Sequence, residues 1–443
     1  MTRVAVIGTG YVGTVTATCF AWLGHDVVGL DVDPVRVGQL AAGQTPLYEP
    51  GLAELLTETL PTGRLSFTDD PAAAISGADV VFLCVGTPPG AGGAPDLTQV
   101  EAAAQSVARH MSPGTVVVNK STVPVGSGNW VRTVIEEALP RTGGPAFAVV
   151  SNPEFLREGS AIHDFLYPDR IVLGGENGSP ARVADLYAPV LQQSFPGGRP
   201  DALPQLIVTD LPSAEMVKYA ANAFLAAKIS FANEVAAICE LVGADARQVL
   251  PAIGADARIG SRFLQHGLGW GGSCFGKDVA ALVATAVDYG YGAPMLRAAV
   301  EINQAQRAAA IRKLQSELKV LKGRRITVLG LAFKPGTDDL RDSPAVEIIQ
   351  RLRTAGAVVS AYDPVVKQLP PDDGAGVRIA ADPYDAADRA DAVVLATEWD
   401  AFTDLDLARL AAQMHGDLLL DGRGVVDVAA GRAAGLRVIG FGW

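Results

Sequence analysis

VAVIGTGYVG, residues 4–13, joins a short apolar run to a turn that contains three glycines. A helical stretch follows, and a second apolar run at residues 26–30 comes after it. A strand, a glycine turn, a helix and a second strand in this order are typical of a unit that binds a dinucleotide. In such a unit Gly8 permits the tight turn, Gly10 lets a pyrophosphate approach the backbone, and Gly13 lets helix and strand pack closely.

An acidic residue, Asp31, ends the second predicted strand. Its carboxylate is placed to accept hydrogen bonds from the ribose hydroxyls of adenosine and would repel a 2′-phosphate, which favours NAD over NADP. Asp33 is a rival for this role, but the strand position favours Asp31. Arg36 is evidence in favour of NADP, because an arginine nearby can bind the 2′-phosphate. We expect NAD as the cofactor.

The alternation of strand and helix continues beyond this unit. Further apolar strands are predicted at residues 80–85, 116–118 and 148–150, with helical segments between them. This alternation predicts a parallel, doubly wound sheet with helices on both faces. Residues 86–88 and 121–124 each follow a predicted strand, so they are candidates to line the cleft at the carboxyl ends of the strands.

The composition changes near Pro212. Residues 213–241 are rich in alanine and predict one long helix, capped by Ser213 and stopped by Gly243. Helical composition resumes at residues 277–321, where Pro294 is expected to start the last long helix.

After residue 322 the α/β pattern returns, without a second GxGxxG, so this region need not bind a dinucleotide. Strands are predicted at 326–330, 358–363, 392–396 and 418–421, and a helix at 345–355. The predicted fold is α/β, with two Rossmann-like doubly wound parallel-sheet domains flanking an all-helical domain. The predicted boundaries are 1–211 for NAD binding, 212–322 for the helical domain, and 323–443 for the second Rossmann-like domain.

The bulk composition excludes several classes of protein. The 443 residues carry a net charge of −12, which argues against bulk affinity for nucleic acid or an anionic membrane. The four cysteines are scattered and the five histidines are dispersed, so we expect neither a disulfide framework nor a metal site. We predict no signal peptide and no membrane span. Together these features favour a reducing cytoplasm.

Residues 271–278, GGSCFGKD, place a thiol where a helix is expected to begin, behind two glycines that let a ligand approach the backbone. The amino terminus of a helix favours anions, and therefore the thiolate of Cys274. Asp278 follows four residues later and shares its helical face. Cysteines usually behave as small buried hydrophobes, and the other three lie in apolar patterns. Cys274 instead lies among polar residues and glycines, which predicts a reactive thiol.

Two further pairs have the same four-residue spacing. Lys218 and Asn222 lie on one face of the long helix, and Glu154 and Glu158 follow a strand end. Each pair taken alone is more often a solvated helix face than an active site. Apolar and alanine residues surround Lys218, however, so its ammonium would be buried unless an anionic group meets it.

These motifs occur in one order along the chain, and the set resembles the UDP-glucose/GDP-mannose dehydrogenase family over essentially its whole length. The matching segments are 8–13, 121–126, 152–159, Lys218 with Asn222, 271–278, 330–339 and 421–423. GGSCFxKD and NPEFLREG are highly specific, whereas the glycine fingerprint alone is not. Residues 167–172 look more like the UDP-glucose branch of the family.

The resemblance implies a four-electron oxidation of the C6 alcohol of UDP-glucose to the carboxylate of UDP-glucuronate, using two NAD. Cys274 would add to the intermediate aldehyde as a thiolate, which gives a thiohemiacetal and, after the second oxidation, a thioester. Lys218 would stabilise the oxyanions at C6, with Asn222 as a second donor.

Two acids compete for the role of activating the water that releases the product. Asp278 is placed to do this or to hold Lys218, and Glu154 is a candidate general base, acting through water with Thr122. Glu158 is expected on the nicotinamide side.

The resemblance also implies which residues hold the two ligands. The residues for NAD are Gly8, Gly10, Tyr11, Val12, Gly13, Asp31, Arg36, Thr87, Thr122, Glu158 and Lys277. The residues for the nucleotide sugar are Glu154, Phe155, Leu156, Lys218, Asn222, Arg258, Phe263, Gly267, Gly271, Phe333, Lys334 and Arg423. Arg258 matches a position that reaches the substrate from a neighbouring subunit, which implies a homodimer or a larger homo-oligomer built on the central helices.

Three alternatives remain open. A related enzyme of the family would oxidise GDP-mannose or UDP-N-acetylmannosamine. A two-electron hydroxyacid dehydrogenase would use Lys218 as its acid or base and leave Cys274 inert. A catalytically silent protein would only bind a nucleotide sugar or sense NAD.

Overall fold

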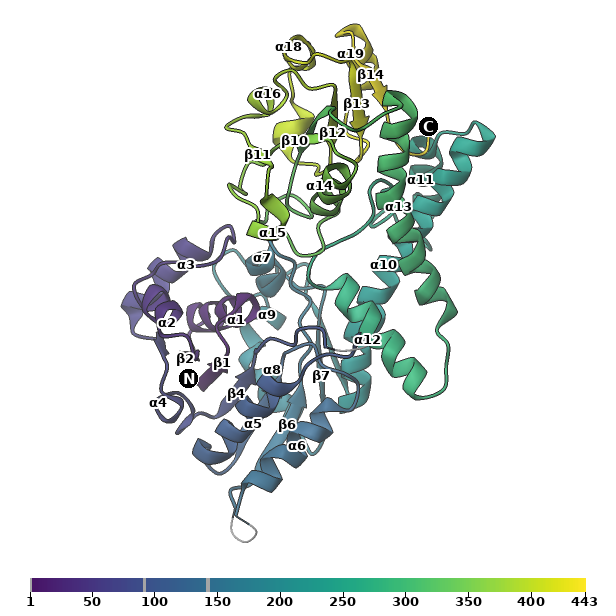
Figure 1. Ribbon diagram of the computed structural model, residues 1–443. Helices are drawn as coiled ribbons and strands as arrows, with labels where there is room; N and C mark the ends of the chain where they lie inside the picture. Colours follow the sequence, from purple (N-terminus) through teal and green to yellow (C-terminus); the bar gives the residue numbers. More distant parts are fainter. Residues whose placement is uncertain (1, 91–92, 141–143) are drawn as a thin grey trace. The chain divides into compact units, whose positions relative to one another are not determined.

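Figure 1 shows the computed structural model of the chain, which describes residues 2–90, 93–140 and 144–443. Contacts between Cα atoms divide the chain into two units. The first comprises Met1–Ala221 with Ala280–Tyr289, and the second comprises Asn222–Val279 with Gly290–Trp443. Two helices, α10 (Leu211–Val242) and α12 (Phe275–Asp288), each begin in one unit and end in the other. The division into three domains at residues 211 and 322 stays a prediction.

The first unit is built on an eight-stranded sheet in the order β3-β2-β1-β4-β5-β6-β7-β8. Strands β1 to β6 are parallel, and in their register Val4 of β1 lies between Val27 of β2 and Val80 of β4. The strand order reverses between β1 and β4, which is where open α/β sheets bind their ligands. The bounds are β1 Arg3–Ile7, β2 Asp26–Leu30, β3 Leu65–Thr68, β4 Val80–Leu83, β5 Thr115–Asn119, β6 Phe147–Ser151, β7 Arg170–Gly175 and β8 Gln205–Thr209.

Helices cover both faces of this sheet, as predicted. Side chains alternate across a strand, so Val4 and Val6 of β1 belong to one apolar core and Ala5 and Ile7 to the other. Helices α1, α3, α7 and α8 contribute to the first core, and α4, α5 and α6 to the second. The bounds are α1 Tyr11–Trp22, α2 Pro34–Ala41, α3 Leu52–Thr59, α4 Pro71–Ile75, α5 Thr98–His110, α6 Ser127–Ala138, α7 Ala161–Leu166, α8 Ser179–Leu186 and α9 Ala188–Leu191.

The sheet departs from the predicted parallel arrangement at one place. Strand β7 runs antiparallel to β6, with Ser151 opposite Gly174, and β8 then runs parallel to β7. Because β7 begins at the edge where β6 ends, the connection at residues 152–169 does not cross back over the sheet. The whole connection therefore stays at the carboxyl edge of β6, where it supplies several of the predicted site residues.

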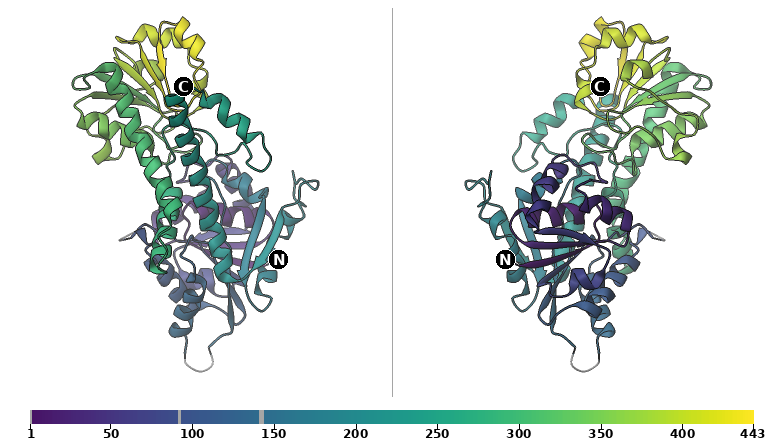
Figure 2. Two further views of the ribbon diagram at one scale, coloured as in Figure 1. Left: turned by 90° about the vertical axis from the view of Figure 1, so that its right-hand side faces the viewer. Right: turned by 90° about the vertical axis from the view of Figure 1, so that its left-hand side faces the viewer.

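The second unit contains a fully parallel six-stranded sheet in the order β11-β10-β9-β12-β13-β14. Figure 2 shows this sheet from two opposite sides. One apolar core packs α13 and α14 on one face, and a second core packs α16, α17 and α18 on the other. The strands are β9 Arg325–Leu329, β10 Val358–Tyr362, β11 Arg378–Ile379, β12 Ala392–Leu395, β13 Leu418–Asp421 and β14 Arg437–Ile439. The helices are α11 Ala246–Gly254, α13 Pro294–Leu318, α14 Pro344–Thr354, α15 Pro371–Gly374, α16 Pro383–Ala386, α17 Asp400–Thr403, α18 Leu407–Gln413 and α19 Val428–Ala433.

The long helix was predicted correctly, but its predicted cap was wrong. Helix α10 begins at Leu211, so Ser213 lies inside its first turn. The side chain of Asp210 takes the capping position instead, because its Oδ1 accepts a hydrogen bond from the backbone N–H of Ser213 at 2.7 Å. A carboxylate at this position also interacts favourably with the helix dipole. Helix α13 begins at Pro294, as expected.

Candidate active site

The three glycines of the first turn lie as the fingerprint requires. Gly8 has a φ of +90°, and a Cβ on Gly13 would lie 1.8 Å from the carbonyl oxygen of Gly8. A Cβ on Gly10, by contrast, would meet nothing within 4 Å. The tight turn and the close packing of helix on strand therefore require Gly8 and Gly13. The space over Gly10, at the amino terminus of α1, is open to a ligand.

Asp31 lies at the end of β2, where the ribose-binding acid is expected. Its Oδ2 accepts hydrogen bonds from the backbone N–H of Thr9 at 2.8 Å and from the Thr9 hydroxyl at 2.9 Å, and it lies 3.2 Å from Nη1 of Arg36. Burial alone would raise the pKa of Asp31, but the hydrogen bonds from Asp33 N–H and Thr9, together with the Arg36 guanidinium, hold it below its ordinary value. The carboxylate is therefore ionised and joined to the glycine turn.

The two residues that complicated the choice of cofactor have clear places. Asp33 caps α2, where its side chain accepts from the N–H groups of Val35 and Arg36, so it is engaged as a helix cap. Arg36 forms an ion pair with Asp31. Of the two acids, Asp33 is therefore engaged as a helix cap, and the role of Asp31 in binding the ribose stays a prediction.

A buried acid that the sequence analysis overlooked joins this region to the connection after β6. Glu49 is 6% exposed and accepts hydrogen bonds from the N–H groups of Gly159 and Ala161, each at 2.7 Å. The hydroxyl of Tyr11 donates to the same carboxylate and accepts from Gly159 N–H at 2.9 Å. The pKa of Tyr11 is raised by burial and by its hydrogen bond to Glu49. A single acid in a loop carries no periodic or motif signal, which is why it was missed.

The loops that follow β4 and β5 meet, as their place at the carboxyl edge predicts. The hydroxyl of Thr87 donates to the carbonyl oxygen of Thr122 at 2.8 Å, and the hydroxyl of Ser121 donates to that of Val85 at 2.8 Å. Thr87 and Thr122 are therefore held together at this edge.

Lys218 is buried, as its apolar neighbours in the sequence suggested, and the anionic group that pairs with its ammonium is the carboxylate of Glu154. Nζ of Lys218 lies 2.8 Å from Oε1 of Glu154, and the two side chains are 5% and 6% exposed. Burial alone would raise the pKa of Glu154, but the charge and hydrogen bond of Lys218 and the N–H of Leu156 lower it. The ring of Phe155 lies beneath the same ammonium, 5.6 Å from its centroid.

Glu154 and Glu158 do not share a helical face. Residues 152–157 form irregular chain after β6, and a turn follows at 158–159. Their four-residue spacing therefore does not place them on one helix face, and Glu154 is paired with Lys218.

Cys274 lies directly before Phe275, the first residue of α12, as predicted. Its carbonyl oxygen accepts the first helical hydrogen bond, from Asp278 N–H at 2.8 Å, so Cys274 occupies the capping position. The side chain is exposed, whereas Cys19, Cys84 and Cys239 are buried. The pKa of the Cys84 thiol, for comparison, is raised by burial to about 12. Its accessibility and its position at a helix terminus both distinguish Cys274 from the other three cysteines.

Asp278, one helical turn after Cys274 on α12, is almost fully buried, and its carboxylate contacts two other candidate residues. It is 1% exposed, its Oδ2 accepts from Nδ2 of Asn222 at 2.6 Å, and its Oδ1 lies 3.1 Å from Nζ of Lys277. Asn222 lies one helical turn from Lys218 on α10. Asn222, Lys277 and Asp278 therefore form one polar cluster.

The two glycines before the thiol are required by the packing of the chain itself. A Cβ on Gly271 would lie 2.2 Å from the carbonyl oxygen of Asp342, and a Cβ on Gly272 would lie 2.7 Å from the ring of Phe333. The N–H of Gly272 also donates to the carbonyl oxygen of Arg341 at 3.1 Å. The loop after β9 therefore approaches both glycines closely.

The carboxyl edge of the second sheet gathers other predicted substrate residues. Phe333 and Lys334 follow β9, and Arg423 follows β13. Nη1 of Arg423 donates to the carbonyl oxygen of Gly269 at 3.2 Å, and Leu268 N–H donates to that of Gly422 at 3.1 Å. Residues 267–271, which contain three glycines, therefore lie against the loop of Arg423.

Asp363 shows why this second sheet differs from the first. It ends β10 as Asp31 ends β2, but its Oδ2 accepts hydrogen bonds from the N–H groups of Leu331 and Ala332 and from Nε1 of Trp399. This carboxylate holds its own loop in place, which agrees with the absence of a second dinucleotide fingerprint.

Of two other predicted substrate residues, Arg258 stands apart from these clusters, whereas the ring of Phe263 lies beside that of Phe275, with centroids 6.3 Å apart. The side chain of Arg258 is 89% exposed and forms an ion pair with Asp256 at 2.6 Å. Phe263 adopts a φ of +63°, which is unusual for a bulky residue and is found most often at functional sites.

Residues 2–90, 93–140 and 144–443 contain no group of three or more His, Cys, Asp or Glu side chains arranged to hold a metal ion. Over the same residues, every helix is too short or too polar to span a membrane.

Three family models match the chain. The NAD binding domain of the UDP-glucose/GDP-mannose dehydrogenase family matches residues 2–191, its central domain matches residues 212–305, and its UDP binding domain matches residues 327–428.

Individual relatives match over nearly their whole length. UDP-glucose 6-dehydrogenase TuaD of Bacillus subtilis is 44% identical over 436 residues, which cover 98% of this chain and 92% of the relative. UDP-glucose 6-dehydrogenase of Rhizobium meliloti is 46% identical over 425 residues, which cover 96% and 95%. The solved structure of a UDP-glucose dehydrogenase from Pyrobaculum islandicum superposes with a TM-score of 0.88 at 40% identity and covers 97% of this chain and 96% of that one.

Proposed function

The chain belongs to the UDP-glucose/GDP-mannose dehydrogenase family, and on this basis we propose that it oxidises UDP-glucose to UDP-glucuronate. Its first domain is the NAD-binding domain of that family. The observation that carries the proposal is the exposed thiol of Cys274 at the amino terminus of α12, because a four-electron oxidation needs a group that retains the aldehyde between its two steps.

The residues of the first unit fit NAD. The open space over Gly10 admits a pyrophosphate, and the ionised Asp31 is suited to ribose hydroxyls. Bound NAD supplies the hydride acceptor in each of the two oxidation steps. The residues of the first unit proposed to hold it are those of the glycine turn, Asp31, Arg36, Thr87, Thr122 and Glu158. The family resemblance adds Lys277.

The chain's own residues carry the other steps. As the C6 alcohol is oxidised, its proton passes to a base, for which the ionised Glu154 is the candidate. The thiolate of Cys274 then adds to the aldehyde carbon, and a C–S bond forms to give a thiohemiacetal. Oxidation of this adduct leaves a thioester. Water adds to the thioester carbon, the C–S bond breaks, and the carboxylate leaves while Cys274 regains its thiolate.

Lys218 and Asn222 are proposed to stabilise the oxyanions that form at C6. The ammonium of Lys218 is held by Glu154, and the amide of Asn222 is held by Asp278, so both donors are oriented in advance. The water that releases the product is activated by Glu154 with Thr122 or by Asp278. Asp278→Asn distinguishes the two acids, because Glu154 is also the candidate base of the first step. If Asp278 activates the water, this variant should accumulate a thioester at Cys274, detectable by mass spectrometry. If Glu154 activates it, no thioester should accumulate in Asp278→Asn.

The decisive measurement is the number of NADH formed per nucleotide sugar consumed. We expect a value near two with UDP-glucose, whereas a value near one would show a two-electron dehydrogenase. Turnover of GDP-mannose or UDP-N-acetylmannosamine in preference to UDP-glucose would assign a different substrate within the family, and no turnover of any of the three would show a binding protein.

A substitution tests the thiol itself. Cys274→Ser should lower the rate of UDP-glucuronate formation by at least about 10³-fold while UDP-glucose still binds, because a hydroxyl is a far weaker nucleophile than a thiolate. Cys239→Ala, at a buried cysteine, is the matched control and should form product at the normal rate. Normal product formation by Cys274→Ser would make Cys274 a structural residue.

A further inference from the structure

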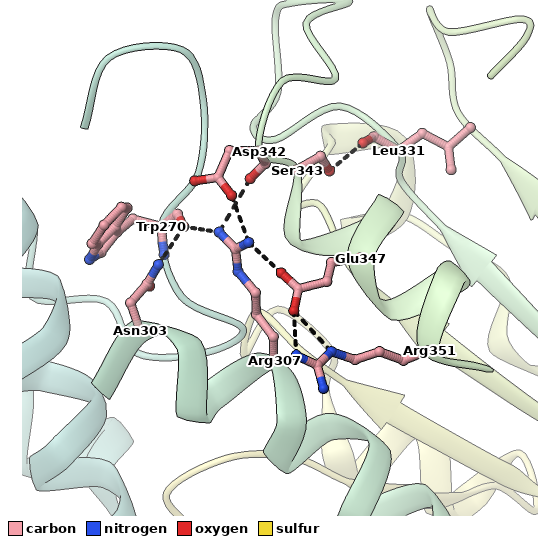
Figure 3. A network of polar contacts seen from close by, with 8 residues as sticks. All are labelled: Trp270, Asn303, Arg307, Leu331, Asp342, Ser343, Glu347 and Arg351. Atoms are coloured by element: carbon pink, nitrogen blue, oxygen red, sulfur yellow. Dashed lines mark hydrogen bonds and ion pairs between the residues drawn. The ribbon is translucent and has the colours of Figure 1, made fainter. Parts of the chain in front are cut away.

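Two side chains of α13 hold the backbone of Trp270, which lies four residues before the thiol. Oδ1 of Asn303 accepts from Trp270 N–H at 2.7 Å, and Nδ2 of Asn303 donates back to the Trp270 carbonyl oxygen at 3.0 Å. Nη2 of Arg307, one helical turn further on, donates to the same carbonyl oxygen at 2.9 Å. Figure 3 shows the amide and the guanidinium converging on this one residue.

These contacts are buried, and the neighbouring chain is shaped to allow them. Asn303 is 2% exposed and Arg307 is 5% exposed. A Cβ on Gly269 would lie 2.3 Å from Oδ1 of Asn303, so the amide fits only beside a glycine. The indole of Trp270 is fixed as well, because its Nε1 donates to the hydroxyl of Ser230 at 3.0 Å. Both the backbone and the side chain of Trp270 are therefore immobilised.

Arg307 also holds the loop that packs on the two glycines. Its Nη1 lies 2.7 Å from Oδ1 of Asp342 and 2.5 Å from Oε2 of Glu347, and its Nη2 lies 3.3 Å from the Asp342 carbonyl oxygen. Ser343 closes the base of this loop, because its hydroxyl donates to the carbonyl oxygen of Leu331 at 2.6 Å. Figure 3 shows Arg307 between Trp270 on one side and Asp342 and Glu347 on the other.

We infer that Asn303 and Arg307 are positioning residues for the thiol, a pair that we call the Trp270 clamp. Between Trp270 and Cys274 the chain contains two glycines, which restrict the backbone little by themselves. The clamp fixes the start of this segment and, through Arg307, the loop that covers it. A displacement of about 1 Å in a reacting group can lower a rate by about 10²-fold, so a fixed starting point has a direct effect on how well the thiolate meets the aldehyde.

The two members of the clamp should act differently. Asn303 contacts Trp270, whereas Arg307 contacts both Trp270 and the loop that contains Phe333 and Lys334. Loss of Asn303 should therefore affect the thiol step alone. Loss of Arg307 should affect the thiol step and the affinity for the nucleotide sugar. This inference rests on the proposed function, in which the thiol acts only after the first oxidation.

The test is a single-turnover experiment with enzyme in excess over UDP-glucose and saturating NAD, following NADH formation. Asn303→Asp keeps an acceptor for Trp270 N–H but sets a carboxylate against the Trp270 carbonyl oxygen. We expect the first NADH to form at the wild-type rate and the second at least about 10-fold more slowly, with aldehyde that hydroxylamine can trap. Arg307→Lys should show the same slow second phase and also a raised KM for UDP-glucose.

A matched control changes an amide to an acid elsewhere on α13. Gln306 is also buried, at 7% exposed, and Gln306→Glu should leave both phases unchanged. Equal slowing of the two phases in Asn303→Asp and Arg307→Lys would show a structural role and overturn the inference, as would unchanged kinetics in both. If Asn303→Asp does not fold, Arg307→Lys alone decides between these outcomes. Failure of the proposed function itself would appear separately, as wild-type enzyme that forms a single NADH per UDP-glucose.

Discussion

Among single residues, the buried pair of Lys218 and Glu154 combines stability with chemistry. Glu154→Gln removes the carboxylate that neutralises a buried ammonium, and breaking such a pair destabilises a protein by about 3–5 kcal/mol. We expect a loss of this size at neutral pH in urea denaturation, together with a large loss of activity. The matched control is Glu176→Gln, because Glu176 is 60% exposed in its pair with Arg132 and such surface pairs contribute about 1 kcal/mol or less.

The direction of the pKa shift of Glu154 determines how the stability contributed by this pair depends on pH. The pKa of Glu154 is lowered in the folded protein from an ordinary value of 4.5. Its contribution to stability is therefore fully present above pH 4.5 and is lost as the pH falls through the folded-state pKa. The stability difference between wild type and Glu154→Gln should shrink on acidification below pH 4.5. A difference that stays constant down to the acid transition would contradict this account.

The site residues that could be predicted from the sequence were those whose side-chain chemistry differs from that of their neighbours in the sequence. Cys274 stood out by its polar neighbours, and Lys218 by the apolar residues around it. Glu49 could not be found in this way, because it is an acid in an ordinary loop context. Asp363 stands at a strand end, but that position does not show which groups its carboxylate binds. Their importance comes from backbone N–H groups that only the folded chain brings to them.

At the scale of an element, the first turn and helix α1 form the nucleotide-binding unit. Gly10→Ala places a methyl group in open space, so the fold should be retained while the KM for NAD rises at least about 10-fold, because the methyl group occupies the path of the pyrophosphate. Gly38→Ala, at another open glycine within α2, should leave the KM unchanged and stabilise the protein by about 0.5–1 kcal/mol. An unchanged KM in Gly10→Ala would mean that NAD does not approach this turn.

Helix α10 is joined to the amino terminus of α6 by Glu215. The carboxylate is 4% exposed and accepts from the N–H groups of Gly126 and Gly128 at 2.6 and 2.7 Å. Burial raises its pKa above 4.5, and these hydrogen bonds offset only part of that rise. The folded state therefore binds this proton more tightly than the unfolded state does, and stability falls as the pH rises through the folded-state pKa.

Replacing this carboxyl by an amide should remove that dependence. Between pH 4.5 and 7 the free energy of unfolding of wild type should decrease relative to that of Glu215→Gln, measured in parallel urea titrations. Parallel curves for the two proteins across this range would show that the pKa of Glu215 is the same in the folded and unfolded states.

The elements themselves were largely predictable, because strand and helix periodicities are local properties of the sequence. The reversed direction of β7 was not, since it depends on where a connection crosses the sheet and not on any single run of residues. The cap of α10 was misplaced for a similar reason. Asp210 and Ser213 are both good capping residues, and only the backbone geometry shows which of them lies at the helix start.

At the scale of the whole molecule, Arg258 is the residue whose proposed role needs a second copy of the chain. Its side chain is exposed, and the family resemblance places it at a neighbouring subunit's substrate. We expect Arg258→Ala to raise the KM for UDP-glucose at least about 10-fold by removing a charged contact to the substrate diphosphate. The unfolding midpoint should not change, since the residue is exposed.

Subunit mixing tests whether the contact crosses between chains. Arg258→Ala and Cys274→Ser subunits should each be impaired alone, but in the homodimer that we propose a mixed pair would contain one site with both native residues. Activity should therefore reappear when the two variants are unfolded and refolded together. A mixture no more active than the sum of its parts would place Arg258 in its own subunit's site or remove it from the site altogether.

The glycines at 271 and 272 set a limit on how this scaffold can be redesigned. Because Asp342 and Phe333 of the same chain occupy the space above them, no choice of sugar frees these positions for substitution. In a mutational library intended to admit a different hexose, substitutions at these two positions would yield no useful variants. Variation at these two positions would disrupt the chain's own packing before it altered selectivity, so a directed-evolution campaign should hold both constant.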